Sequence, residues 1–350
     1  MSQTGSAACV KVSAFAVFML FFQVLGAQYN FNGLEGKLLQ YQKQLGDNAV
    51  TLIYKDGKIV YTKEQGDFKA NTPAPIASCS KWLTAALVMT FVDEGKLSLD
   101  DKVSTYLPIF ERYMKNYITV RQCLSHLTGI HDDKGIMAIF KMSRYATLED
   151  EVNDFASKHD IDAQPGKEFR YSSIGLNIAG RICEIVGKKS FEQLMQQRLF
   201  KPLAMKNTTF QRDFGKAPNP SGGAISTAND YMNFLVMILN KGMYNGKQIL
   251  SEAAINQMEQ AQTTPDLIKY APAAAEGFNY GFGEWLLEQD ANGKGICVSS
   301  PGLFGTWPMV DNCRGYASIV FVKTLLSSEQ KKDVYMDIKS SIDSIFPCTK

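Results

Sequence analysis

The sequence predicts an α+β fold with two lobes, in which a sheet formed by both ends of the chain carries a mostly helical insertion. Three observations indicate this: an early strand hairpin, a helical block over residues 97–260, and a run of strand-like segments after residue 279. No helices separate the late strands, so we expect an antiparallel meander that the early hairpin completes. The expected lobes are residues 28–96 with 261–350, and residues 97–260, flanked by helices on the sheet.

The first predicted elements are a hairpin and a buried helix. Residues 50–54 and 58–62 are apolar, β-branched runs on either side of the pair Asp56 and Gly57, a typical two-residue hairpin signal. Residues 78–94 are apolar nearly all round, as in a buried helix, and Gly95 ends the segment. A sheet edge therefore leads into a central helix.

The remaining elements follow the hydrophobic pattern. Further helices are expected at 121–127, 148–157, 174–186, 191–199, 230–239 and 252–260. Ser190 and Gln193 stand three residues apart, which predicts a capping box at the start of one of them. Strands are expected at 281–287, 296–299, 306–310 and 316–322, and a last helix at 329–345.

Composition restricts the class of function. The 350 residues are 45% hydrophobic and carry a formal charge of only +2, with basic residues spread along the chain. Such a chain folds around a large core and lacks the clustered positive charge of a nucleic-acid-binding protein. The three histidines do not have the spacing of a metal site. We expect a small-molecule or peptide substrate, no nucleic acid, no metal and no cofactor; the oligomeric state is left open.

The N-terminal segment 1–27 predicts a signal peptide. Lys11 precedes an apolar run over residues 12–25, and the small residues Gly26 and Ala27 follow it. We expect cleavage, secretion to the periplasm or the cell exterior, and no stable membrane insertion afterwards. The alternative is an uncleaved membrane anchor, although the run is shorter than the roughly 20 apolar residues that usually span a bilayer.

Six cysteines remain after residue 27. An oxidising compartment would allow them to pair. Cys297 and Cys313 lie symmetrically about Gly305, between two strand-like runs, and we expect that they could face each other across a hairpin; the full pairing stays open. Reduced, packed thiols are expected within the helical patterns, at Cys79, Cys123 and Cys183.

Ser78 and Lys81 are the first candidate site. Their i,i+3 spacing puts both side chains on one face of a helix. At a helix N-terminus the free N–H groups and the dipole favour negative charge, which helps to form an alkoxide and lowers the pKa of the lysine. The alternative is a capping serine with a lysine that reaches solvent. The same spacing recurs at Ser328 and Lys331, where an ordinary helix cap before a polar helix is expected.

Tyr171 is a second candidate. It precedes a predicted helix, and a phenol beside a lysine can relay a proton if nearby positive charge lowers its pKa from about 10. The alternative is a buried aromatic ring with a satisfied hydroxyl group. Tyr231 and Asn233 show a Tyr-x-Asn pattern, but they lie within a helical pattern and are expected in the core.

The segment 300–305 on the late sheet is a third candidate. Gly302 lets the backbone approach a ligand closely. The N–H of Leu303 could join that of Ser78 in holding an oxyanion, an interaction worth roughly 3 kcal/mol per donor. Taken alone, the segment is only a turn.

Several blocks of the sequence together resemble the β-lactamase-related serine hydrolases. They occur in the family's order over about residues 50–325 and read IASCSKWLTA (76–85), EGKLSLDDKV (94–103), CLSHLTGI (123–130), PGKEFRYSS (165–173), FKPLAM (200–205), SGGAISTAND (221–230) and PGLFG (301–305). The group includes class C β-lactamases, penicillin-binding D-Ala-D-Ala peptidases, D-aminopeptidases and β-lactamase-like esterases. The resemblance implies a β-lactamase/transpeptidase-like fold and one catalytic domain over residues 28–350.

By this resemblance, Ser78 is the acylated nucleophile, Lys81 its proton acceptor, and Tyr171 assists protonation and deacylation. Whether the lysine or the tyrosine is the base stays open. Ser173 stands where the family has the asparagine of Tyr-x-Asn. Ser300 to Gly302 replace the Lys-Thr-Gly or His-x-Gly motif, so the cation that usually binds a substrate carboxylate is missing.

The string Lys323, Thr324, Leu325 is expected to be a chance match to Lys-Thr-Gly at the end of a strand. The differences from the family motifs at Ser173 and at Ser300 to Gly302 favour an esterase or a peptide-like amide hydrolase. Two alternatives remain: a catalytically weak or silent member that acts as a binding or structural protein, and a true β-lactamase or D-Ala-D-Ala peptidase.

Overall fold

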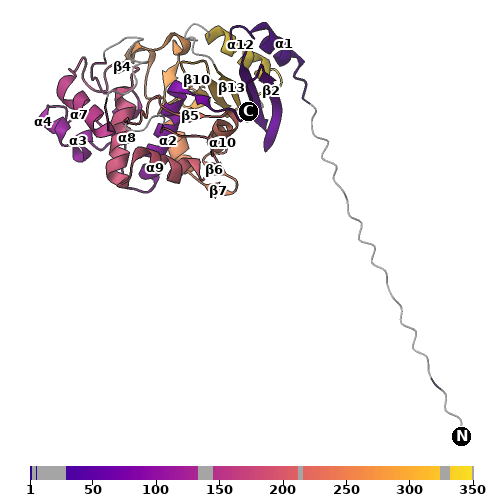
Figure 1. Ribbon diagram of the computed structural model, residues 1–350, viewed down its shortest axis with the longest axis horizontal. Coiled ribbons are helices and arrows are strands. Elements are labelled where there is room, and N and C mark those ends of the chain that lie inside the picture. The colour runs from indigo at the N-terminus through magenta and orange to yellow at the C-terminus, as the bar shows by residue number, and fades with distance from the viewer. Residues whose placement is uncertain (2–4, 6–28, 133–144, 212–215, 324–331, 349–350) are drawn as a thin grey trace. The chain divides into compact units, whose positions relative to one another are not determined.

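The computed structural model describes residues 29–132, 145–211, 216–323 and 332–348 together with Met1 and Gly5 (Figure 1). Within these residues, the main sheet is antiparallel and has seven strands in the order β2-β1-β13-β12-β11-β10-β9. Its strands are β1 (Ala49–Lys55), β2 (Lys58–Gln65), β9 (Asn279–Tyr280), β10 (Trp285–Gln289), β11 (Gly295–Ser299), β12 (Trp307–Asp311) and β13 (Tyr316–Val322). Pairing of β1 with β13 joins the early hairpin to the late strands. The predicted α+β fold with a completed meander is confirmed.

The turn between β1 and β2 has the predicted local geometry. Asp56 and Gly57 both have positive φ, 50° and 82°. Positive φ at both turn residues gives a two-residue turn the same right-handed twist as the two strands that it joins. The hairpin is therefore fixed by residues next to each other in the chain.

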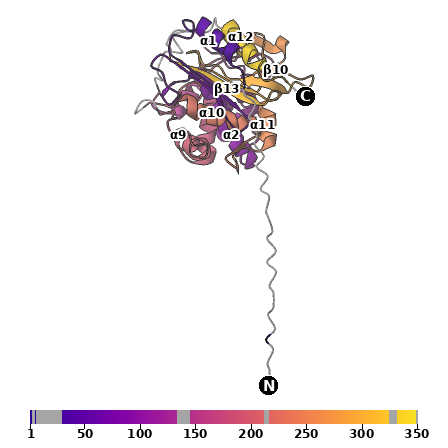
Figure 2. The same ribbon diagram turned by 90° about the vertical axis from the view of Figure 1, so that its right-hand side faces the viewer.

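Helices cover both faces of the sheet. Figure 2 shows α1 (Asn32–Gln40) and α12 (Lys332–Asp343) on one face, with α2 (Ser80–Asp93) and α10 (Ala228–Leu239) on the other. Helix α10 packs against β1, β12 and β13, and α1 packs against α12. The terminal segments thus form one layer, and the central helices form the other.

The inserted segment between α2 and β9 is mostly helical, as predicted. Its helices are α3 (Val103–Tyr106), α4 (Ile109–Arg112), α5 (Val120–Leu124), α7 (Leu148–Lys158), α8 (Ile174–Gly187), α9 (Phe191–Met195) and α11 (Glu252–Met258). A π-helical turn, Gln196–Phe200, continues α9. Short 3-10 turns lie at η3 (Pro265–Leu267) and η4 (Ala273–Ala275), and paired short strands are β3 (Ala74–Pro75) with β5 (Ile225–Ser226), β4 (Phe169–Arg170) with β8 (Ile268–Tyr270), and β6 (Met243–Tyr244) with β7 (Lys247–Gln248).

Local signals set the ends of several helices. Ser190 and Gln193 form the predicted capping box at the start of α9. Thr119 and Gln122 form a second one at α5. Helix α2 needs no polar face because every residue from Ser80 to Phe91 is buried, and a helix that is apolar on all sides belongs in a core.

The strand expected over residues 281–287 begins four residues later than predicted. Strand β9 ends at Tyr280 and β10 begins at Trp285. Between them, Gly283 has a φ of 75° and lies against α2, where a Cβ would be 2.6 Å from the carbonyl oxygen of Lys81. Close packing on the central helix therefore keeps residues 281–284 out of the strand, and a periodicity pattern does not reveal that contact.

The disulfide expectation was wrong. Cys313 pairs with Cys348, and Cys297 is free and buried. In the register of β11 and β12, Cys297 lies opposite Asp311, two residues short of Cys313. Cys313 thus falls in the turn before β13, where the segment after α12 brings Cys348 to it. Cys79, Cys123 and Cys183 are free and buried, as expected.

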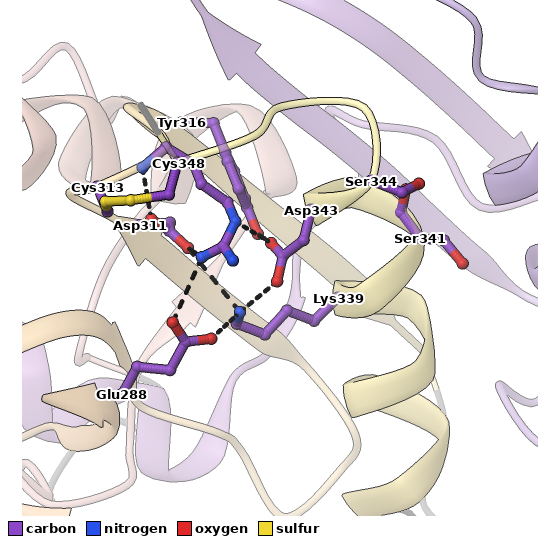
Figure 3. A network of polar contacts seen from close by, with 10 residues as sticks. Glu288, Asp311, Cys313, Tyr316, Lys339, Ser341, Asp343, Ser344 and Cys348 are labelled. Atoms are coloured by element: carbon purple, nitrogen blue, oxygen red, sulfur yellow. Dashed lines mark hydrogen bonds and ion pairs between the residues drawn. A yellow bond between two sulfur atoms is a disulfide. The ribbon is translucent and has the colours of Figure 1, made fainter. Parts of the chain in front are cut away.

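Beside this disulfide, charged side chains join α12 to the sheet (Figure 3). Three carboxylates, Glu288, Asp311 and Asp343, lie close together there, and Arg314 and Lys339 form ion pairs with them. Lys339 Nζ is 2.6 Å from Asp343 Oδ2 and also bonds Glu288, and Arg314 Nη1 is 2.9 Å from Asp311 Oδ2. Because the two cations compensate the carboxylates, this acidic group is a paired structural network.

Some predictions fall outside the described residues. They include nearly all of the expected signal peptide, the second serine-lysine pair at Ser328 and Lys331, and Thr324 and Leu325. Across the described helices, we find none with both the length and the apolar character that crossing a bilayer requires. Tyr231 is fully buried, as expected for a core residue.

Candidate active site

Ser78 lies on a tight turn immediately before the central helix. The 3-10 turn η1 (Ala77–Cys79) leads into α2, and the φ of Ala77 is 45°, a strained value for a residue with a side chain. Two contacts fix the turn: Tyr231 Oη donates to Cys79 O at 2.8 Å, and Ile76 N donates to Ala224 O at 3.0 Å. Ser78 itself stays partly exposed.

The amine of Lys81 lies against this hydroxyl group. Lys81 Nζ is 3.3 Å from Ser78 Oγ and donates to Ser221 O at 2.8 Å. The side chain is almost fully buried. Burial lowers the pKa of Lys81 to about 7, although the negative charge of Asp132 acts in the opposite direction. A large fraction of the amine is therefore uncharged near neutral pH.

Tyr171 completes the group. It follows β4, and its N–H donates to Tyr270 O at 3.1 Å. Lys81 Nζ lies 4.7 Å from the centre of the Tyr171 ring. Burial raises the pKa of Tyr171 above its usual range, while a hydrogen bond with Ser78 acts to lower it. Its phenol therefore keeps its proton at neutral pH.

The third predicted motif packs against the same turn. Ser300 is buried, and its Oγ lies 2.9 Å from Gly283 O and 3.3 Å from Ser78 O. A Cβ on Gly302 would be 2.4 Å from Ile76 O, so only glycine fits there. Leu303, the next residue, is partly exposed.

The predicted site residues thus differ in how closely they lie together. The structure brings Ser78, Lys81 and Tyr171 into contact and sets Ser300 and Gly302 against the turn that carries Ser78. Ser173 is exposed at the N-cap of α8, and its side chain makes no capping bond. The hydroxyl of Ser300 is used for contacts within the protein.

Sequence reasoning missed the partner that fixes the lysine. The carbonyl group of Ser221 accepts from Lys81, and Asn177 Oδ1 accepts from the N–H of Ser221 at 3.0 Å. Thr84, one turn along α2 from Lys81, donates to Pro220 O at 2.7 Å. A backbone carbonyl has no residue signature, so the block beginning at Ser221 could be recognised only as a family motif.

An aromatic group around Tyr171 was also missed. Its ring lies 4.6 Å from that of His126 and 5.5 Å from that of Trp285. Tyr280 contacts both of these rings, at 4.9 Å and 4.7 Å. His126 belongs to the block CLSHLTGI, which was the only sequence signal for it.

The fold is that of the β-lactamase/transpeptidase-like proteins, with a serine-lysine pair at the start of the central helix. The sequence model of the Beta-lactamase family matches residues 38–339. The chain therefore belongs to the beta-lactamase family, whose members are generally serine hydrolases acting on small molecules, esterases among them.

Individual relatives agree with this assignment. A structure described as a "putative beta-lactamase" from Bacteroides dorei DSM 17855 has a TM-score of 0.81 and 28% identity, covering 91% of this chain and 99% of that one. A family VIII carboxylesterase has a TM-score of 0.72 at 15% identity, covering 90% and 97%, and is similar in fold. Protein flp of Staphylococcus aureus strain MW2 is 29% identical over 202 residues, which are 53% of this chain and 40% of that protein. The matched part is thus less than half the length of this curated relative.

Proposed function

We propose that the protein is a serine hydrolase in which Ser78 forms an acyl-enzyme, with Lys81 as proton acceptor and Tyr171 as an assisting proton donor. One observation carries this proposal: a buried amine lies 3.3 Å from the hydroxyl group of a partly exposed serine. With its pKa lowered to about 7 by burial, the amine can be neutral at working pH. A neutral amine next to a hydroxyl group is a general base.

The proposed reaction has two acyl-transfer steps. Ser78 Oγ attacks the substrate carbonyl carbon while its proton passes to Lys81 Nζ. The tetrahedral intermediate collapses, and the leaving alcohol or amine takes up a proton from the Lys81–Tyr171 pair. Water then gives a proton to Lys81 and attacks the carbonyl carbon of the acyl-enzyme. The bond from that carbon to Ser78 Oγ breaks, Ser78 takes the proton back from Lys81, and the acid is released. The N–H groups of Ser78 and Leu303 are the proposed donors to the oxyanion.

The two titratable groups have separate roles in this scheme. Burial raises the pKa of Tyr171 above its usual range and lowers that of Lys81. The phenol therefore keeps its proton when the amine has lost one. Opposite shifts in neighbouring groups assign the acid and the base, so we propose Lys81 as the base. The carbonyl of Ser221 accepts one amine hydrogen, and in the proposed scheme the lone pair of the neutral amine takes the proton of Ser78.

The proposed substrates are carboxylic esters or peptide-like amides without a carboxylate at the usual position. Ser300 stands where the cation of the third motif is expected, and its hydroxyl group is bonded to Gly283 and Ser78. Ser173, in place of an asparagine, is exposed. Without a cation to bind it, a carboxylate of the penicillin type gains little from this site. Similarity in fold to a family VIII carboxylesterase supports an ester substrate.

We also propose that the protein is secreted. The support is the N-terminal pattern of Lys11, an apolar run and two small residues. The bonded pair of Cys313 and Cys348 is what an oxidising compartment allows. Sequencing the N-terminus of the exported protein tests this, and cleavage after Ala27 is expected.

The catalytic proposal is tested with a chromogenic short-chain ester and a fluorophosphonate probe. Turnover is expected from the wild type, and mass spectrometry is expected to place the adduct on Ser78. Ser78→Ala should abolish both signals, and Lys81→Met should reduce kcat by about 100-fold or more. The matched control is Ser328→Ala, which changes the other serine of a Ser-x-x-Lys spacing in the sequence and should leave both signals unchanged.

The same assay separates the alternatives. Absence of both turnover and labelling in the wild type would contradict the proposal and favour a silent binding protein. Efficient nitrocefin hydrolysis or a stable penicillin adduct would instead favour a β-lactamase or cell-wall peptidase. Turnover of the ester with little activity on nitrocefin is the expected result.

A further inference from the structure

His126 holds the backbone on both sides of Tyr171. The carbonyl oxygen of His126 accepts from Arg170 N at 3.1 Å, and its ring atom Nδ1 accepts from Ser172 N at 3.3 Å. Between these two bonds the imidazole lies against the Tyr171 ring, with the ring centres 4.6 Å apart. One residue thus binds the amides before and after the tyrosine as well as its ring.

The hydrogen bonds define the protonation of the imidazole. Because Nδ1 accepts the N–H of Ser172, it carries no hydrogen, and the hydrogen of a neutral ring must lie on Nε2. There it can donate to Tyr280 Oη, 3.1 Å away. Tyr280 is fully buried and pairs with β10 through β9. The ring therefore links the Tyr171 segment to the edge of the large sheet.

The surroundings keep this ring neutral. His126 is almost fully buried. Burial, and then the positive charge of Lys81, hold the pKa of His126 well below its usual value. An imidazolium would carry hydrogens on both nitrogens and would have to release the N–H of Ser172. The φ of His126 is 57°, a left-handed value that is uncommon for a residue with a side chain.

We propose that His126 is a positioning residue for Tyr171, acting as a neutral, Nε2-protonated imidazole that fixes the phenol relative to Ser78 and Lys81. The proposal rests on the function proposed above, in which Tyr171 assists proton transfer. It predicts that loss of the Nδ1 acceptor lowers kcat and changes KM little, since substrate binding does not involve this ring. No hydrogen of His126 is transferred in the reaction.

Two variants of equal size test the acceptor. Asparagine tolerates positive φ and offers an oxygen close to the position of Nδ1, whereas leucine has the same shape without an acceptor. His126→Leu should reduce kcat about tenfold or more, while His126→Asn should stay within about threefold of wild type. His159→Leu is the matched control, because His159 bonds His131 O and packs on Phe155 instead. Its kcat should be unchanged.

A spectroscopic measurement keeps the test independent of folding in the variants. In wild-type protein with ¹⁵N-labelled histidine, the side-chain ¹H–¹⁵N spectrum should show one ring that remains neutral with Nδ1 unprotonated, and His126→Asn should remove it. A wild-type level of kcat in His126→Leu, or a charged or Nδ1-protonated ring at neutral pH, would overturn the proposal. If the wild type shows neither turnover nor labelling of Ser78, the proposed function fails first, and the positioning role fails with it.

Discussion

At the scale of single residues, the surroundings of Lys81 determine the pKa of its amine. Burial lowers its pKa to about 7, against the opposing charge of Asp132. Since the base must be uncharged, we predict that kcat/KM rises with pH through about 7 and then levels off. Below that value, activity should fall about tenfold per pH unit, because each unit removes that fraction of neutral amine. A pH–rate profile with a neutral ester measures this.

A substitution at Asp132 should move the acid limb of the pH–rate profile, which is the part below about pH 7 where activity rises with pH. Its carboxylate stabilises the charged amine, so Asp132→Asn should lower the pKa of Lys81 further and shift the acid limb to lower pH. A shift to higher pH, or a profile without an acid limb in the wild type, would show that another group acts as the base.

Glu284 is a second residue whose burial has a measurable effect. It is fully buried, and neither carboxylate oxygen has a hydrogen-bond partner among the described residues. Burial, and then the charge of Glu259, raise the pKa of Glu284 well above 4.5; Lys241 and a weak approach of the Trp82 indole only partly offset this. The folded protein therefore holds a proton that the unfolded chain releases.

This linkage predicts the effect of Glu284→Gln. The stability due to the protonated carboxyl group is complete below about pH 4.5 and is lost as the pH rises above it. Glutamine stays neutral, so the variant and the wild type should unfold at similar temperatures near about pH 4, and the variant should be the more stable near about pH 8. Thermal unfolding across pH measures this, with Glu111→Gln as the exposed control. A variant that is less stable at every pH would mean that the carboxyl group has partners of its own.

At the scale of elements, the connection between β11 and β12 supports the turn before α2. Gly302 approaches Ile76 so closely that a Cβ would lie 2.4 Å from its carbonyl oxygen. Gly302→Ala should therefore lower the free energy of unfolding by about 1–3 kcal/mol. It should also reduce kcat, because the displaced backbone leads directly into the turn that carries Ser78. Denaturant unfolding and ester turnover measure the two effects.

Gly36→Ala is the matched control for this change. Gly36 lies in α1, and a Cβ there would meet nothing within 4 Å. Alanine in a helix interior is favoured over glycine, so this variant should be as stable as the wild type or more so. Equal effects of the two substitutions would mean that the close approach at Gly302 contributes little.

At the scale of the whole molecule, the disulfide connects the end of the chain to the sheet. Cys313 and Cys348 are separated by 35 residues and enclose β13 and α12. The chain-entropy model gives such a loop about 3–4 kcal/mol. The double variant Cys313→Ala with Cys348→Ala should lose stability of that order and keep its kcat, because the bond lies in the α12 layer. Denaturant unfolding with and without reductant checks this, and an unchanged stability would contradict it.

Residues close together in the chain determined much of the secondary structure of this protein. The pair Asp56 and Gly57 predicts the hairpin, Ser190 and Gln193 predict a helix start, and the apolar run after Ser78 predicts a buried helix. The spacing of Ser78 and Lys81 likewise needs only one helical turn to place both side chains on one face. Each signal acts over a few residues, so local backbone preference is enough to realise it.

Tertiary structure alone decided which distant segments meet these elements. The carbonyl of Ser221 that binds Lys81, the inward bond of Ser300, the contact of Gly283 with α2 and the pairing of Cys313 with Cys348 all join residues far apart in sequence. Such contacts follow from strand register and the packing of whole helices, and a register offset of two residues sufficed to exclude Cys297 from the disulfide. The sequence by itself therefore determined the individual helices and strands and the candidate nucleophile. Close packing determined the hydrogen-bond partners, the burial and the pKa values on which the proposed chemistry depends.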